Sequence, residues 1–189
     1  MRIGLLRHFP VRLKFPTGLK TAAELMVWCE NYDVAGTDRS DADLGGIEWK
    51  TCIASDLPRA RTTASALFSG TVEFTPLLRE VRFAQFETGN LRLPVFIWKL
   101  ALRLAWLTGH PSQRVCRDDF QQRVRAVADR VSTLEQDTLV VSHAGMMAYL
   151  SSELRRRGFS GPKLRIAKHA TAYVFEKAGP GLCGDARRH

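Results

Sequence analysis

Three short apolar runs place the tightest limit on what this chain of 189 residues can fold into. They cover residues 3–6, 51–55 and 138–142, and the third, with the sequence TLVVS, has the strongest strand character. Apolar runs of about four to eight residues are typical of strands that are buried on both faces. The second and third runs pass directly into stretches with helical spacing. This alternation predicts an α/β protein, here a three-layer α/β/α sandwich with a mainly parallel sheet.

The rest of the chain extends the same pattern. Thr17 or Thr21 is a candidate cap for the first helix, and Gly109 is a stop signal for the third. Two further strands are expected, over residues 71–74 at a sheet edge and over residues 172–176. Helices are expected from Thr17 or Thr21 to about Tyr32, and over residues 56–68, 91–107, 118–134 and 146–150.

Chain length favours a single domain, because a chain of this size builds one substantial core but not two. We therefore expect one domain over residues 1–178. Residues 91–112 are expected to be a helical insertion into this domain. Residues 179–189, which are rich in glycine and charge, are expected to be a flexible tail.

The chain is basic, with 28 Lys and Arg against 19 Asp and Glu and a formal net charge of +9. A phosphorylated metabolite, a nucleic acid and an anionic membrane surface all suit this charge. No segment has the roughly 18 uninterrupted apolar residues that a membrane span needs, and charged residues interrupt the N-terminal stretch before a signal peptide could form. We therefore expect a cytoplasmic protein without a membrane partner. Its four cysteines, none at metal-ligand or redox spacing, are expected to be reduced.

Polar side chains follow each of the three buried runs. They are Arg7 and His8 after the first, Ser55, Asp56 and Arg59 after the second, and Ser142 and His143 after the third. The carboxyl ends of parallel strands meet at one edge of a sheet, so these residues should converge. Guanidinium groups bind phosphate oxygens bidentately, and an imidazole can attack phosphorus as a nucleophile. The pattern therefore indicates a site for a phosphate dianion.

Four motifs in this chain resemble those of the histidine phosphatase superfamily, which has the phosphoglycerate mutase-like fold, and they occur in the family's order. They are Leu6-Arg7-His8, the segment SDLPRARTTA over residues 55–64, Leu78-Arg79-Glu80, and VSHAG over residues 141–145. The resemblance implies roles for five side chains. These are His8 as the phosphorylated nucleophile, Arg7, Arg59 and His143 as phosphate ligands, with His143 also catalytic, and Glu80 as the proton donor. Glu73 and Glu87 are nearby alternatives to Glu80.

The resemblance implies a phosphomonoesterase that hydrolyses a small phosphorylated substrate through a phosphohistidine, with neither a metal nor a cofactor. The chain departs from the family at Phe9-Pro10, where a glycine usually follows the histidine. It also has no asparagine over residues 11–18, which favours a phosphatase over a mutase. A phosphoglycerate mutase-like phosphotransferase and a catalytically weak phosphate-binding module remain alternatives.

Other features of the sequence are weaker indications of function. His110, His169 and His189 lack metal-ligand spacing and are expected on the surface or in loops. Specific nucleic-acid binding ranks last, because only the basic charge favours it and no docking motif accompanies that charge. Substrate specificity is expected in the segments where the resemblance is weakest, residues 9–20, 33–46 and 91–107. The sequence specifies neither the substrate nor the oligomeric state.

Overall fold

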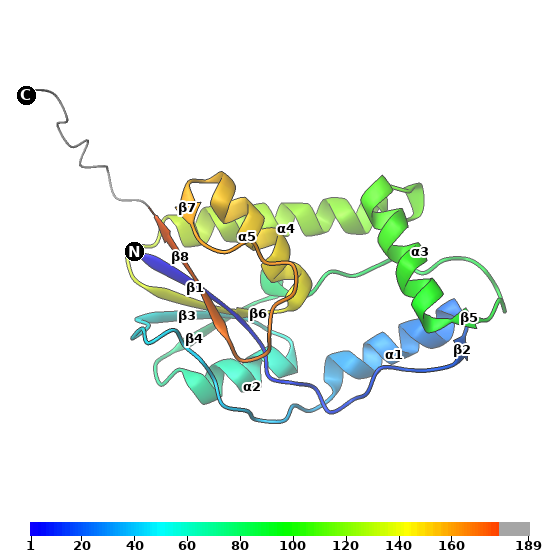
Figure 1. Ribbon diagram of the computed structural model, residues 1–189, viewed down its shortest axis with the longest axis horizontal. Helices are drawn as coiled ribbons and strands as arrows, with labels where there is room; N and C mark the ends of the chain where they lie inside the picture. The colour runs from blue at the N-terminus through cyan, green and yellow to red at the C-terminus, as the bar shows by residue number, and fades with distance from the viewer. Residues whose placement is uncertain (178–189) are drawn as a thin grey trace, which may run out of the picture.

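The computed structural model describes residues 1–177, and within them the main sheet has six strands in the order β4-β3-β6-β1-β8-β7 (Figure 1). Neighbouring strands from β4 to β1 are parallel, whereas β8 runs antiparallel to β1 and β7 antiparallel to β8. The predicted mainly parallel sheet is confirmed. The strands are β1 (Arg2–Arg7), β3 (Thr51–Ser55), β4 (Val72–Thr75), β6 (Thr138–Ser142), β7 (Phe159–Ser160) and β8 (Ala172–Lys177).

Helices cover both faces of this sheet, which confirms the three-layer sandwich. In the described part of the chain the helices are α1 (Ala22–Val34), α2 (Pro58–Leu67), α3 (Val95–Thr108), α4 (Arg114–Ser132) and α5 (Ala144–Arg156), with single 3-10 turns η1 (Pro76–Leu78) and η2 (Pro111–Gln113). Helix α2 packs on one face, and α4 and α5 pack on the other.

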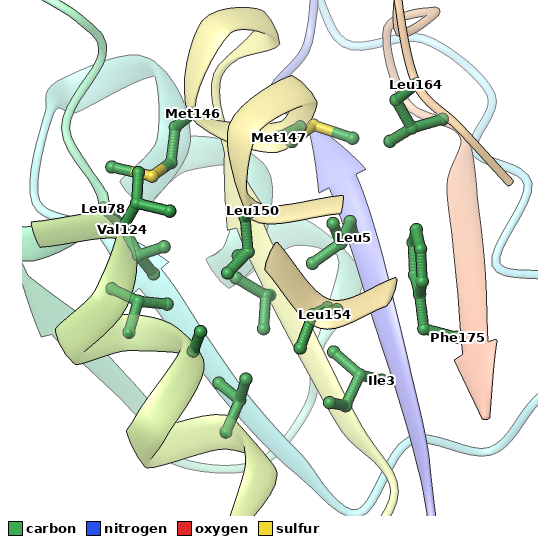
Figure 2. Packing of buried hydrophobic residues seen from close by; sticks show 14 of the residues in the cluster. Ile3, Leu5, Leu78, Val124, Met146, Met147, Leu150, Leu154, Leu164 and Phe175 are labelled. Carbon is green, nitrogen blue, oxygen red and sulfur yellow. The ribbon is translucent and has the colours of Figure 1, made fainter. Parts of the chain in front are cut away.

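The alternation of side chains along β1 divides the core between the two faces. Ile3 and Leu5 point toward α4 and α5, where they join Leu150 and Phe175 (Figure 2). Leu6 points to the opposite face and packs in the cluster that includes α2. All five of these side chains are fully buried. This is the period of two expected of a strand covered on both sides, and removing one such large side chain typically costs about 2–5 kcal/mol.

Gly4 has a packing role in the same strand. A Cβ atom there would lie 2.5 Å from the Trp49 ring, which is itself 7% exposed. The indole N–H donates to the Leu44 carbonyl at 3.2 Å, which fixes the ring over the strand. The glycine therefore lets an aromatic ring cover β1 directly.

Helix α1 begins where one of the two candidate caps predicted it. Thr21 accepts from the backbone N–H of Glu24, and the Glu24 carboxylate accepts from the backbone N–H of Thr21. This reciprocal pair is a capping box, a strong helix start signal. Thr17 is not the cap.

Helix α3 begins four residues later than predicted, at Val95 rather than 91, because Leu93 and Pro94 form β5 (Leu93–Pro94). That strand pairs antiparallel with β2 (Leu19–Lys20) in a small separate sheet. The helix ends at Gly109, whose φ of 70° is the left-handed conformation that glycine adopts without strain. Figure 1 shows α1 and α3 beyond the end of the sheet at which β1 finishes.

The other predicted boundaries differ by a few residues. Helix α4 spans Arg114–Ser132 instead of 118–134, and β4 lies at a sheet edge as predicted. Residues 178–189, including the predicted tail over 179–189, lie outside the described residues. The single domain over residues 1–178 and the insertion at 91–112 stay predictions. Among residues 1–177, no helix has both the length and the apolar character needed to cross a bilayer.

Candidate active site

The carboxyl ends of β1, β3 and β6 bring the predicted residues together at one edge of the sheet. His8 follows β1, Arg59 lies in the first turn of α2 just after β3, and His143 follows β6. Strands β1 and β6 are neighbours, and the His8 and His143 ring centroids are 5.0 Å apart. The two imidazoles and Arg59 are all 2% exposed or less.

His8 is held as a neutral imidazole. Its Nδ1 lies 2.6 Å from the Phe9 carbonyl oxygen, which can only accept, so Nδ1 carries the proton and Nε2 carries the lone pair. Burial lowers the pKa of His8 from 6.5 to about 3, and the positive charges of Arg59 and Arg7 act in the same direction. The ring is therefore neutral, with a lone pair on Nε2 that is free to act as a nucleophile in principle.

The backbone after His8 is firmly held, although Phe9-Pro10 stands where the family usually has a glycine. The Phe9 N–H donates to Thr63 Oγ1 at 2.9 Å, and the Phe9 side chain is fully buried. Thr63 in turn donates to the Arg59 carbonyl at 2.7 Å. The carbonyl that orients the His8 ring therefore belongs to a residue fastened to α2, and a glycine is not needed for this arrangement.

Arg59 lies between a carboxylate and an imidazole. Its Nη1 contacts Asp33 Oδ1 at 2.9 Å, and its Nε donates to His143 Nδ1 at 3.2 Å. Because Nδ1 accepts, the Nε2 of His143 carries the proton and donates to Ser55 Oγ at 2.9 Å. Burial, followed by the charge of Arg59, holds the pKa of His143 well below its ordinary value. His143 is thus neutral and lies behind Arg59.

Arg7 provides a second guanidinium with an unused donor. Its Nη1 donates to the Ala167 carbonyl at 2.9 Å. Its Nε is buried and has no hydrogen-bond partner among the described residues. A buried N–H without an acceptor is costly, so this position suits an anionic oxygen supplied by a ligand.

Glu80 is held at the N-terminus of α5. Its carboxylate accepts from the backbone N–H groups of Gly145 and Met146, both at 3.1 Å. A Cβ atom on Gly145 would lie 2.4 Å from Glu80 Oε1, so this close approach requires glycine. The two alternative carboxylates lie elsewhere, since Glu73 pairs with Arg130, and the exposed Glu87 is not among the residues that line the cavity described below.

A cavity of about 530 Å³ opens over these groups. Arg7, His8, Arg59, Glu80 and Gly145 line it, whereas His143 does not. The remaining walls come from α1, α3 and the segment over residues 79–86. Four of the five predicted site residues therefore share one cavity. The fifth, His143, lies outside it and contacts the cavity-lining Arg59. Within residues 1–177, no group of three or more His, Cys, Asp or Glu side chains could hold a metal ion.

Two residues at the site, His169 and Asp33, were not predicted from the sequence. His169, expected as a surface or loop residue, lies in a loop, but its ring is 5.2 Å from that of His8 and its Nδ1 donates to the His8 carbonyl at 2.6 Å. Burial lowers its pKa, as does Arg7. Asp33, at the end of α1, pairs with Arg59 and Arg82. Motif spacing signals neither residue; only the antiparallel direction of β8, which starts at the site edge, could have indicated His169.

The sequence model of the histidine phosphatase superfamily (branch 1) matches residues 38–180, and the chain belongs to this family. The match contains Arg59, Glu80 and His143 but begins after Arg7 and His8. No curated protein matches the chain.

Several solved structures share the fold at low sequence identity. An Escherichia coli K-12 protein described as a putative alpha-ribazole-5'-P phosphatase is 19% identical, with a TM-score of 0.56, over 92% of this chain and 89% of its own. A mycobacterial glucosyl-3-phosphoglycerate phosphatase is 20% identical, with a TM-score of 0.50, over 82% and 79%. The protein TTHB049 from Thermus thermophilus is 18% identical, with a TM-score of 0.53, over 92% of each chain. The predicted phosphoglycerate mutase-like fold is confirmed.

Proposed function

We propose that this protein is a metal-independent phosphomonoesterase that hydrolyses a small phosphorylated substrate through a phosphohistidine on His8. The observation that carries the proposal is the buried, neutral His8, which has its lone pair on Nε2 and lines the same cavity as Arg7 and Arg59. Membership of the histidine phosphatase superfamily supports the same reaction class.

The reaction has two displacements. In the first, His8 Nε2 forms a bond to phosphorus while the bond from phosphorus to the substrate's ester oxygen breaks, and Glu80, which has first taken up a proton, gives that proton to the ester oxygen. In the second, water attacks phosphorus, Glu80 takes the water's proton, and the P–N bond breaks to release inorganic phosphate. The Nδ1–H stays on the ring throughout, and the Phe9 carbonyl stabilises the positive charge that the imidazole gains.

Charge on the phosphoryl oxygens is met by the two guanidiniums. The unpartnered Nε of Arg7 supplies one donor. Arg59 supplies another, and its Nε donates to His143 Nδ1. The Nε2–H of His143 donates to Ser55 Oγ, so a direct contact of His143 with phosphate requires that bond to open. A well-placed arginine contributes about 10³–10⁵ in rate to other phosphoryl transfers. For this reason we propose that no metal is needed, and activity should persist in the presence of EDTA.

The direct test is to trap the phosphohistidine. Wild-type protein is mixed with a radiolabelled phosphomonoester, denatured in alkali and assayed for label that is lost in acid. His8→Ala should retain no label and should lose turnover of 4-nitrophenyl phosphate. His110→Ala is the matched control, because His110 is exposed and the hydrogen bonds of its side chain are to Ser112 in the same turn. Equal turnover by wild type and His8→Ala would disprove the mechanism.

The same preparation separates the alternatives. Phosphorus NMR with 3-phosphoglycerate would show isomerisation for a mutase and release of inorganic phosphate for a phosphatase. Binding of vanadate without turnover of any phosphomonoester would indicate a phosphate-binding module instead.

A further inference from the structure

The part of the cavity farther from His8 is walled mainly by carbon. We call it the apolar chamber and define it by Leu25 and Trp28 from α1, Phe83 and Phe86 from the segment after Glu80, and Trp98 and Leu102 from α3. The phosphate-facing groups lie in the same cavity. One cavity therefore combines a cationic end with an apolar chamber.

The two indoles of the chamber have no polar atom to offer a ligand. The Trp98 N–H donates to the Lys20 carbonyl at 2.7 Å, and the Trp28 N–H donates to the Lys14 carbonyl at 3.1 Å. Phe86 stacks on Trp98 with ring centroids 6.3 Å apart. With both donors occupied by backbone, the surfaces that these rings present are apolar, and their positions are fixed.

Three of the arginines that line the cavity are already paired with carboxylates. Arg79 pairs with Asp56, while Arg82 and Arg59 share Asp33. Glu30 is exposed on α1 and adds a negative charge. A second anionic group on a substrate would therefore compete with Asp33 and Asp56 for these arginines and would be repelled by Glu30, whereas an uncharged group meets no such competition.

The cavity is also much larger than a phosphoryl group needs. Its volume of about 530 Å³ lies in the range of about 300–1,000 Å³ typical of pockets that enclose whole organic ligands. Once the phosphoryl group lies against His8, most of the space left is the apolar chamber.

We propose that the substrate is the phosphomonoester of an uncharged, largely apolar alcohol, whose chain or ring occupies the apolar chamber while its phosphoryl group lies on His8. This inference rests on the proposed phosphatase function of the same site. It excludes small polyhydroxylated and carboxylated phosphates as preferred substrates.

A series of primary alkyl phosphates tests this without changing the chemistry of the leaving group. We expect kcat/KM to rise from methyl to butyl to hexyl phosphate, because each buried methylene is worth up to about fourfold in an equilibrium. Propyl phosphate should exceed glycerol 1-phosphate, its polar counterpart of equal carbon number, by about tenfold or more. A flat series, or a preference for glycerol 1-phosphate, would overturn the inference.

Two leucines on α3 provide a matched pair of variants. Leu102 lines the chamber, whereas Leu100 is 53% exposed on the outside of the same helix. Leu102→Ser should lower the ratio of kcat/KM for hexyl over methyl phosphate by about fivefold or more, and Leu100→Ser should keep the wild-type ratio. Phe86→Ser, outside any helix, gives the same readout if Leu102→Ser fails to fold.

Different results would refute the phosphatase function and the apolar substrate class. If 4-nitrophenyl phosphate and the whole alkyl series are left intact, the phosphatase function is wrong and the inference falls with it. If the phosphates are hydrolysed but Leu102→Ser and Phe86→Ser keep the wild-type ratio, only the apolar substrate class is wrong.

Discussion

The buried neutral His8 should make the protein less stable in mild acid. In the unfolded chain this imidazole titrates near its ordinary pKa of 6.5, whereas burial keeps the folded pKa at about 3. Between these values the unfolded state binds a proton that the folded state does not, so the free energy of unfolding falls as pH falls. Above pH 6.5 both states are neutral at this residue, and it adds no pH dependence.

The magnitude follows from the span of pH that is crossed. Each pH unit below 6.5 removes about 1.4 kcal/mol until the folded pKa is reached. Going from about pH 7.5 to about pH 5 crosses one and a half such units, so His8 alone should remove about 2 kcal/mol. His143 shifts in the same direction and adds to the loss in the wild-type protein.

Urea denaturation of wild type and His8→Gln at the two pH values measures this contribution. Glutamine does not titrate, so the variant should lose about 2 kcal/mol less than wild type over the same interval. His110→Gln, at the exposed histidine, is the control and should follow wild type. If His8→Gln and wild type lose the same free energy, then His8 is protonated in the folded protein near pH 5 and the argument from burial is wrong.

Two further substitutions test how the site is held. Gly145→Ala places a methyl group 2.4 Å from Glu80 Oε1, so the carboxylate must move. We expect kcat to fall about tenfold or more, while the melting temperature hardly changes. An unchanged kcat would show that Glu80 need not lie there. Thr63→Val preserves shape but removes the acceptor of the buried Phe9 N–H, which should lower the free energy of unfolding by about 1–3 kcal/mol in urea titrations and misalign His8. Stability and kcat equal to wild type would remove Thr63 from that role.

Much of the fold is readable from the sequence, because each buried strand has its own local signal. The ranges 51–55 and 138–142 agree with β3 and β6 to the residue, since each has three apolar residues between a Thr and a Ser and is followed by a helix. The late start of α3 is different. It depends on the pairing of Leu93 with Lys20, a contact between distant segments that no local pattern encodes.

The site residues likewise include some that could be predicted from the sequence and some that could not. His8, Arg59 and His143 follow parallel strands, whose carboxyl ends lie at one edge of a sheet, so their convergence could be predicted. Asp33 and His169 reach the site from the end of a helix and from a loop, and their partners are set by tertiary packing. The roles of all these residues in catalysis stay proposals.

The position of β1 in the sheet has a consequence for the order of folding. Its neighbours are β6 and β8, and its partner in register for Ile3 is Thr138, about 135 residues further along the chain. Pairings this distant in sequence form slowly, because a long loop must close first. Until they form, the apolar side chains of Leu5 and Leu6 stay uncovered. Burial of His8, which follows this strand, should therefore be a late event in folding.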